Sequence, residues 1–213
     1  MLDTSSRATG SGANGVPSVM EVETLDRFEQ GLAPIAYRID RLDRIVEVDD
    51  AWRAFAVAND APELAGDSIV GRPLWDFIAG SETRQLWHEL LDRVRTGVTA
   101  DVSLRCDSPG RRRRLDLQLV PLQDGGVQFR ATVAGAEDRA PVELLDSLYA
   151  DGTPIRVCGW CRRVDVDGYV EVEEAIARLG LLEQDMRPVT HTLCPDCAAT
   201  IHAQMAAQTT TPR

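Results

Sequence analysis

Two pairs of cysteines near the end of the chain constrain its fold more than any other feature. Cys158 and Cys161 form one Cys-x-x-Cys pair, and Cys194 and Cys197 form the second. The two-residue gap lets both sulfurs of a pair reach the same ion, so two such pairs can surround one tetrahedral metal. Thiolates are soft ligands that hold zinc at neutral pH. The sequence therefore predicts a structural zinc site with these four cysteines as ligands.

The residues around the two pairs fit a small fold that a metal would stabilise. Residues 164–170 indicate a hairpin with Asp167-Gly168 at its turn. A short helix is expected at 173–179, a strand at 188–193 and a closing helix at 198–206. A segment this small, with few large apolar side chains, needs additional stabilisation, and bound zinc would supply it.

Other uses of the four cysteines are weaker interpretations. Attachment of c-type haem is excluded because Arg162 and Ala198, rather than histidine, follow the two pairs. Iron in a rubredoxin-like or iron–sulfur site also takes four cysteines, so zinc and iron both stay open. A redox dithiol at Cys-Gly-Trp-Cys lacks the expected βαβ context. His191 lies three residues before Cys194 and is the alternative metal ligand.

Earlier in the chain, the period of the apolar residues predicts an α+β domain. Strands are expected at 35–39, 44–48, 102–106, 115–119 and 127–133, and helices at 21–32, 51–58 and 81–95, with short helical turns over 60–80. Asp49 or Asp50 is the predicted N-cap of the second helix, and Ser81 that of the third. The expected fold is a five-stranded antiparallel sheet with helices on one face.

Composition and the order of the predicted elements divide the chain into five parts. Gly, Ser, Ala and Thr dominate the first residues, and the end of the chain is similar. The predicted organisation is a disordered tail at 1–20, the sheet domain with its N-terminal helix at 21–134, a helical linker at 135–154, the four-cysteine module at 155–205 and a disordered tail at 206–213.

The order of elements in the sheet domain, with two short motifs, resembles a PAS domain over about residues 32–134. The motifs are Arg44-Ile45-Val46 leading into Asp49-Asp50-Ala51-Trp52, and Gly71-Arg72-Pro73-Leu74-Trp75-Asp76-Phe77. The resemblance implies a five-stranded sheet that encloses a small pocket with its helices and senses a ligand, a cofactor or redox state, or dimerises. The side chains expected to face the pocket, or only to fill the core, are Tyr37, Trp52, Phe55, Trp75, Phe77, Leu104, Leu117 and Phe129.

Specific sensor chemistries find little support in the residues. A light-oxygen-voltage flavin photosensor needs a reactive cysteine in the helical region, and residues 50–96 contain none. His88 could be a haem ligand, but it lies on the polar side of its helix and is expected to be solvated. Cys106 is expected to be a buried structural thiol, and His202 an exposed helical residue. The run Arg111–Arg114 fits either an anionic partner or a solvated hairpin edge.

The cysteine segment also resembles a zinc-ribbon-like module that follows PAS and receiver domains in bacterial signalling proteins. That module reads Cys-x-Trp-Cys-Lys, a short acidic helix, then Ser-His-Gly-Ile-Cys-Pro-x-Cys. The four cysteines, Trp160, His191 and Pro195 coincide, whereas Arg162, Thr190, Thr192 and Leu193 replace lysine, serine, glycine and isoleucine. The resemblance implies a bacterial cytoplasmic signalling protein and no particular activity.

Charge and hydropathy narrow the function classes further. The net charge is −11, and residues 154–202 hold five arginines against eight acidic residues, which argues against binding to nucleic acid. No apolar run is long enough to span a membrane, and the first residues do not read as a secretory signal. No catalytic triad, phosphate loop or carboxylate pair is recognisable, so no enzymatic activity is expected.

The sequence thus favours a PAS sensor or interaction protein of the bacterial cytoplasm. It would hold zinc at the four cysteines and an unidentified small molecule in the pocket of the PAS domain. It would also act on a protein signalling partner and form a homodimer. The alternative is a thiol redox switch in which oxidation releases the zinc. A haem-binding gas or redox sensor and a transcription regulator are weaker interpretations. Catalysis by the metal is disfavoured because four cysteines leave no open position.

Overall fold

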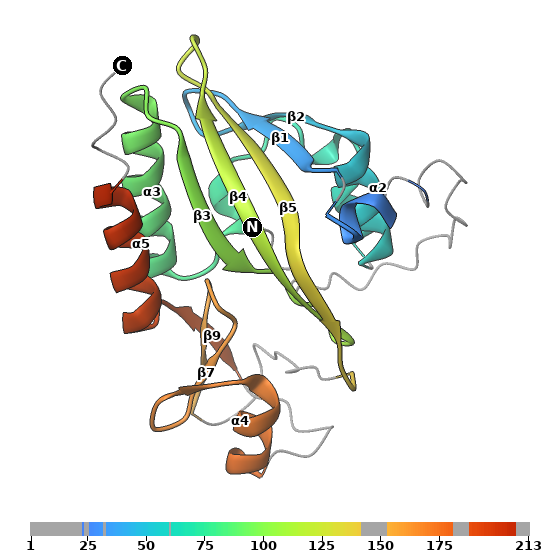
Figure 1. Ribbon diagram of the computed structural model, residues 1–213, viewed down its shortest axis with the longest axis vertical. Helices are drawn as coiled ribbons and strands as arrows, with labels where there is room; N and C mark the ends of the chain where they lie inside the picture. The colour runs from blue at the N-terminus through green and yellow to red at the C-terminus, as the bar shows by residue number, and fades with distance from the viewer. Residues whose placement is uncertain are drawn as a thin grey trace.

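The computed structural model describes residues 23, 26–31, 33–59, 61–141, 153–180 and 188–207, which form a larger and a smaller sheet (Figure 1). The larger sheet is antiparallel and has the order β2-β1-β5-β4-β3. Its strands are β1 (Ile35–Ile39), β2 (Ile45–Val48), β3 (Ala100–Arg105), β4 (Arg111–Pro121) and β5 (Val127–Asp138). The tail at 1–20, most of the predicted linker helix and residues 208–213 lie outside the described residues.

Alternation of apolar and polar residues explains the strands. In β4, Leu115, Leu117 and Leu119 are buried, whereas Asp116 and Gln118 between them are exposed. Successive side chains of a strand point to opposite faces, so one face of the sheet is apolar and the other polar. The predicted five-stranded sheet is confirmed. Strand β1 lies inside it, between β2 and β5, and pairs with β5 along its whole length.

Helices cover one face of this sheet (Figure 1). They are α2 (Asp50–Ala58), the 3₁₀ turns η1 (Pro62–Leu64), η2 (Asp67–Ile69) and η3 (Leu74–Phe77), and α3 (Ser81–Arg95). Asp49 caps α2, because its carboxylate accepts the backbone N–H of Trp52 at 2.7 Å. The predicted cap of α3 is wrong: Ser81 is the first helical residue, and the cap is Gly80 at φ +84°. A Cβ at Gly80 would lie 2.6 Å from the carbonyl oxygen of His191, so only glycine fits.

The smaller sheet has the order β8-β7-β6-β9. Its elements, with two helices, are β6 (Ile155–Cys158), β7 (Val164–Asp165), β8 (Tyr169–Val170), α4 (Val172–Leu179), β9 (Val189–Thr192) and α5 (Pro195–Ala207). The predicted hairpin turn is present, with Asp167 at φ +51° and Gly168 at φ +121°. Strands β6 and β9 pair in parallel, with Cys158 opposite Thr192. This register brings the two cysteine pairs to the same end of the sheet.

The cysteine end of the smaller sheet joins the hydrophobic core of the larger one. Trp160, between Cys158 and Cys161, is only 4% exposed, and its ring centroid lies 5.1 Å from that of Trp87 on α3. Ile201 and Met205 of α5 belong to the same buried cluster, and α5 lies beside α3 and β3 (Figure 1). After the boundary predicted at 154/155, the first strand of the smaller sheet contributes to a separate small cluster, and the shared core resumes at Cys158.

Close packing of Gly159 against α3 gives a test of this shared core. A Cβ on Gly159 would lie 2.7 Å from Oγ1 of Thr83, which is buried and donates to the carbonyl of Thr192 at 3.3 Å. We expect Gly159→Ala to lower the free energy of unfolding by about 1–3 kcal/mol through overpacking. Denaturant unfolding of the metal-loaded protein measures the change.

The control is Gly66→Ala, because a Cβ at Gly66 meets nothing within 4 Å. Thr83→Ala should rescue part of the loss in the double variant, since it removes the hydroxyl that the new methyl group would strike. The carbonyl of Thr192 stays satisfied in that variant, because it also accepts the N–H of Gly159 at 2.8 Å. Equal costs for Gly159→Ala with and without Thr83→Ala would contradict the proposed contact.

Candidate metal centre

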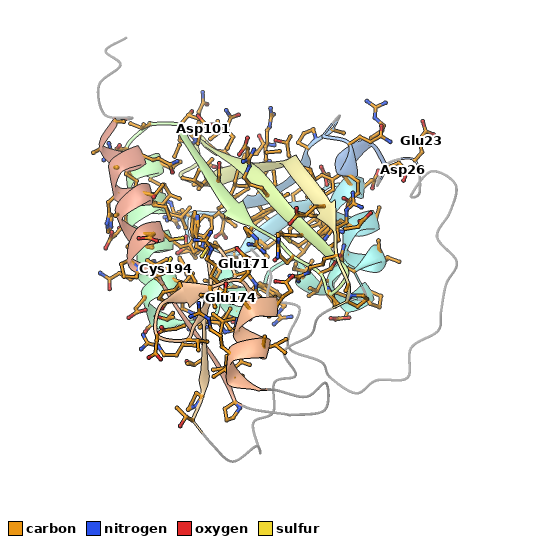
Figure 2. All side chains as sticks on the ribbon, turned by 60° about the horizontal axis from the view of Figure 1, so that its bottom comes forward. Glu23, Asp26, Asp101, Glu171, Glu174 and Cys194 are labelled. Atoms are coloured by element: carbon orange, nitrogen blue, oxygen red, sulfur yellow. The ribbon has the colours of Figure 1, made fainter. Side chains whose placement is uncertain are left out.

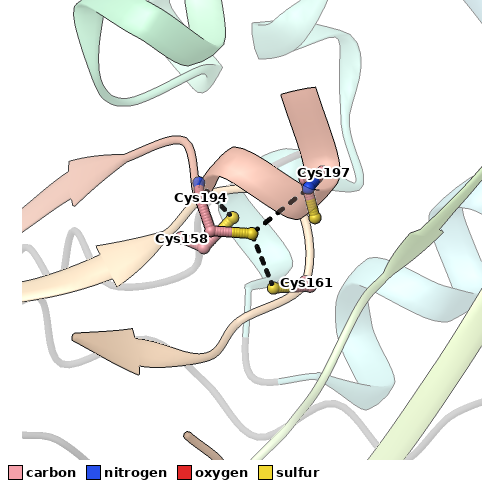
Figure 3. Close-up of side chains that lie close together, drawn as sticks. All are labelled: Cys158, Cys161, Cys194 and Cys197. Carbon is pink, nitrogen blue, oxygen red and sulfur yellow. Dashed lines mark hydrogen bonds between the residues drawn. The ribbon is translucent and has the colours of Figure 1, made fainter. Parts of the chain in front are cut away.

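The sulfurs of Cys158, Cys161, Cys194 and Cys197 all lie within 4.8 Å of one another (Figure 3). The Sγ atoms of Cys161 and Cys194 are 3.8 Å apart, and none of the four cysteines is in a disulfide. In a tetrahedral zinc site with Zn–S bonds of about 2.3 Å, neighbouring sulfurs are about 3.8 Å apart. The arrangement therefore fits a four-coordinate thiolate site, and the sequence-predicted ligands meet at one point.

Backbone geometry fixes both cysteine pairs. The N–H of Cys194 donates to Sγ of Cys158 at 3.4 Å, and the N–H of Cys197 donates to Sγ of Cys194 at 3.4 Å. The N–H of Cys158 donates to the carbonyl of Arg163 at 2.8 Å, which closes the loop around Cys161. Cys197 lies in the first turn of α5, where the helix dipole favours negative charge. Both the amide donors and the dipole stabilise thiolates over thiols.

The four sulfurs are too close to be ionised together without a cation. Hydrogen bonds from Cys161 and Cys197 lower the pKa of the Cys158 thiol far below its ordinary value. The same hydrogen bonds keep the protons on the donor thiols of Cys161 and Cys197. The pKa of Cys161 therefore rises to about 12, and that of Cys197 also rises strongly. A divalent cation at the centre would remove this competition and allow all four thiolates to form. The donor set thus suits a soft divalent metal.

None of the three histidines, all of which the structure describes, belongs to this group of ligands. His191, the alternative ligand, is a partly buried residue of β9 and is not part of the group of four sulfurs. His88 is exposed on α3, where its ring stacks on that of Trp75 with centroids 3.7 Å apart. His202 is exposed, as expected, and its Nε2 lies 3.2 Å from a carboxylate oxygen of Glu89. The described arrangement therefore favours the all-cysteine set.

Each cysteine pair is tied to the larger domain by its own hydrogen bonds. Nε1 of Trp160 donates to the carbonyl of Ser103 at 2.7 Å, and the N–H of Arg105 donates to the carbonyl of Trp160 at 2.9 Å. The first pair thereby covers the edge of β3. On the other side, the carboxylate of Glu82 accepts the N–H of Leu193 at 2.9 Å and the hydroxyl of Thr192, and these bonds lower the pKa of Glu82.

Ion pairs form a second connection between the two sheets. Arg105 of β3 donates through Nη1 to both oxygens of Glu171, at 3.0 and 2.8 Å, and Arg112 donates through Nη2 to Glu173 at 2.9 and 3.0 Å. Glu171 lies where the four-cysteine module meets the larger sheet (Figure 2). Arg139 adds a third arginine, 3.0 Å from Glu173. Burial alone would raise the pKa of Glu171, but the bonds from Arg105 and Arg163 lower it overall.

The sequence left two interpretations of the arginine run at 111–114, an anionic partner or a solvated hairpin edge, and the structure shows acidic partners for Arg111–Arg113, whereas Arg114 is exposed. These residues belong to β4, and Arg113 is only 6% exposed. Its Nε donates to Glu29 at 2.8 Å, and Arg112 binds Glu173. The anionic groups bound by these arginines belong to the same chain. Sequence reasoning missed them because the partners are distant in sequence and only the fold brings them together.

A small cavity of about 90 Å³ lies between α2 and the larger sheet. Four of the eight predicted pocket residues line it, namely Tyr37, Trp52, Phe55 and Leu117. The other four do not. Trp75 is partly exposed and donates to Asp43 at 3.1 Å, Phe77 lies under the guanidinium of Arg72, and Leu104 and Phe129 are buried elsewhere in the core. The alternation of the strands predicted that Leu104 and Phe129 point inward, but it did not predict how far they lie from α2.

The polar lining of the cavity was not predicted. Asn59 follows α2, and Asp107 and Ser108 come from the turn between β3 and β4. Only the fold places this turn opposite α2. Cys106 also lines the cavity rather than continuing the buried face of β3, and desolvation raises the pKa of its thiol. Asp107 binds Arg105, so the cavity and the module contact the same guanidinium.

Comparison with known proteins adds the following findings. No protein-family model and no curated protein matches this chain. Similar solved structures include the PAS domain of Bordetella pertussis BvgS, at 16% identity and TM-score 0.33, covering 47% of this chain and 72% of that one. A sensory box histidine kinase/response regulator domain from Geobacter sulfurreducens has 14% identity and TM-score 0.32, with coverage of 53% and 93%. A Vibrio cholerae sensory box histidine kinase has 10% identity and TM-score 0.36, with coverage of 54% and 92%.

The larger sheet and its helices form a PAS-like fold. Strand number, direction and the placement of helices on one face all follow the expectation from the sequence, and the four cysteines cluster in a second, smaller unit. Among the described helices, none is both long and apolar enough to cross a membrane.

The Arg105–Glu171 pair should contribute measurably to docking of the module. Both side chains are largely shielded from water, and Nη1 of Arg105 donates to both carboxylate oxygens of Glu171. In a double-mutant cycle of Arg105→Gln and Glu171→Gln, we expect a coupling free energy of about 1 kcal/mol in denaturant unfolding. The matched control is Arg178 with Glu174, an exposed pair one turn apart on α4, for which coupling should not exceed about 0.5 kcal/mol. Similar coupling in both cycles would mean that the interface pair does not dock the module.

Proposed function

We propose that this protein is a PAS-type sensor and interaction module of signal transduction, stabilised by a structural zinc ion. The observation that carries the proposal is the meeting of four thiols within 4.8 Å of one another, beside a core that the PAS-like sheet shares. Cys158 and Cys194 belong to that shared core together with Trp160. Zinc would therefore hold the module against β3 and α3, and not merely fold it.

The choice of zinc rests on the donor set. Four thiolates prefer a soft or borderline ion and complete a tetrahedral shell. Such a shell leaves no coordination position for a substrate, so we propose a structural role and no enzymatic activity. The residues that would hold the ion are Cys158, Cys161, Cys194 and Cys197.

The sensing site of this proposal is the cavity under α2. Its volume of about 90 Å³ is below the about 150 Å³ that accommodates benzene in an engineered protein cavity, and far below the several hundred Å³ of sites for drug-sized ligands. A haem or a flavin does not fit it. Asn59, Asp107 and Ser108 offer polar groups beside an otherwise apolar lining, which suits a ligand of a few heavy atoms. We propose that its occupancy alters contacts with a protein partner in the bacterial cytoplasm.

We also propose that the protein assembles as a homodimer and that it does not bind nucleic acid. The acidic balance of the chain and of the module opposes contact with phosphates. Sedimentation velocity over a range of protein concentrations tests the dimer.

Metal analysis tests the zinc site. We expect one equivalent of zinc per chain after gel filtration and no visible absorption band. Cys158→Ser should abolish stoichiometric binding and destabilise the fold, because the serine hydroxyl is a poor ligand at a buried position. Cys106→Ser is the matched control, since Cys106 lies outside the cluster and should leave the zinc content unchanged. Iron with a visible band, or full zinc content in Cys158→Ser, would contradict the proposal.

A cavity-filling variant tests the sensing site. Ala56 is buried on α2 and lines the cavity, so Ala56→Leu should reduce its volume and remove any co-purified small molecule detected by mass spectrometry of the denatured protein. Ala58→Leu, at an exposed position of the same helix, is the control and should retain it. Retention of the same molecule by both variants would place its site elsewhere.

A further inference from the structure

The four-cysteine cluster has a shielded and an accessible side. Cys158 is 0% exposed and Cys194 is 2% exposed, whereas Cys161 and Cys197 are partly exposed. Each Cys-x-x-Cys pair thus contributes one inner and one outer sulfur. A reagent that attacks a cysteine needs access to its sulfur. The outer sulfurs are therefore expected to react faster than the inner ones, although all four are cysteine thiolates.

An open hollow of about 200 Å³ lies against the accessible side. Cys161 and Cys197 line it, together with apolar atoms of Trp160 and Ile201. Thr200 of α5 lies at the hollow and is exposed. The space exceeds the volume of a few water molecules, which take about 30 Å³ each in the liquid, so a small reagent can enter it.

Three charged residues also line the hollow, namely Arg105, Arg114 and Asp196. Arg105 is engaged by the carboxylates of Asp107 and Glu171, and the side chain of Arg114 donates to the carbonyl of Ala134 at 3.5 Å. The carboxylate of Asp196 offsets the charge of Arg114, so the charges at the hollow nearly balance. Access, and not charge, therefore distinguishes the outer sulfurs from the inner ones.

We propose that Cys161 and Cys197 form a modification edge of the metal centre, where peroxides and small neutral electrophiles react first and thereby release the metal. This inference rests on the proposed metal site and adds its regulation. The two inner sulfurs would react only after the module opens.

The oxidation balances without any further reagent. An outer thiolate attacks one oxygen of hydrogen peroxide, an S–O bond forms, the O–O bond breaks and hydroxide leaves, so that sulfur is oxidised and peroxide oxygen is reduced. A second thiolate of the cluster attacks the resulting sulfenic acid, an S–S bond forms, the S–O bond breaks and a second hydroxide leaves. Two thiolates and one peroxide thus give one disulfide and two hydroxide ions. The divalent ion loses two of its four ligands and dissociates.

Alkylation of the metal-loaded full chain tests the accessible edge. Brief treatment with N-ethylmaleimide, followed by denaturation and a second, isotope-labelled maleimide, gives the rate at each cysteine by mass spectrometry. We expect Cys161 and Cys197 to react several-fold faster than Cys158 and Cys194. Cys106, which is also partly exposed but lies outside the cluster, is the internal reference for a thiol that would bind no metal. Equal rates at all four ligands would overturn the proposal.

Blocking the hollow separates access from overall stability. Thr200→Phe should fill it and slow the reaction of the outer cysteines several-fold without removing a ligand. Ala199→Phe is the matched control, because Ala199 is the neighbouring exposed residue of α5 and does not line the hollow. If both variants slow the reaction equally, or neither does, the hollow is not the path of entry.

Peroxide treatment with dimedone as a trap for sulfenic acid, monitored with a metal-release dye, tests the oxidation itself. We expect dimedone on Cys161 or Cys197 before half of the metal is released. Adducts that appear first on Cys158 or Cys194 would overturn the proposal. Metal content is measured on the same sample before treatment: absence of stoichiometric metal refutes the metal site, whereas bound metal with unselective labelling refutes only the modification edge.

Discussion

The parallel pairing of β6 with β9 is the constraint on which the rest of the module depends. It places Cys158 opposite Thr192 and so brings the two Cys-x-x-Cys pairs to one end of the small sheet. From there the first pair reaches the edge of β3 through Trp160, and the second reaches α3 through Glu82. Because the thiols of Cys158, Cys161 and Cys197 compete for protons when no cation is present, a bound metal would complement this geometry.

A shared core explains how so small a sheet stays folded. The buried cluster that belongs to the small sheet alone is formed by Ile155, Val157, Val164 and Ala175, which is little apolar surface for an independent domain. Trp160 adds a large ring, but that ring packs on Trp87 of the PAS-like domain. Docking therefore supplies stability that the module's own side chains do not, and a bound metal would add to it.

Local patterns predicted the elements, and long-range contacts decided the site. Alternating residues gave the strands of the larger sheet, and cysteine spacing gave the four clustered thiols. Nothing in the sequence of Val189–Thr192 indicates that β9 would pair in parallel with β6. The acidic partners of Arg112 and Arg113 were equally hidden, since charge runs look alike whether solvated or paired. The apolar character of a residue predicted that it lies in the core, but not whether it lines the cavity. Phe55 lines the cavity and Phe129 does not.

The arginines of the larger sheet change the meaning of the module's acidic charge. Glu171 and Glu173 raise the negative balance that argues against nucleic acid, yet both are engaged by Arg105 or Arg112. That charge serves an internal interface more than an external one. Arg105 also binds Asp107 at the cavity, through Nε, while its Nη1 binds Glu171, so the cavity lining and the docked module share one guanidinium. If a ligand in the cavity changed the docking of the module through this side chain, docking would change the affinity of the ligand by the same free energy. The cavity and the docking interface thus have one side chain in common.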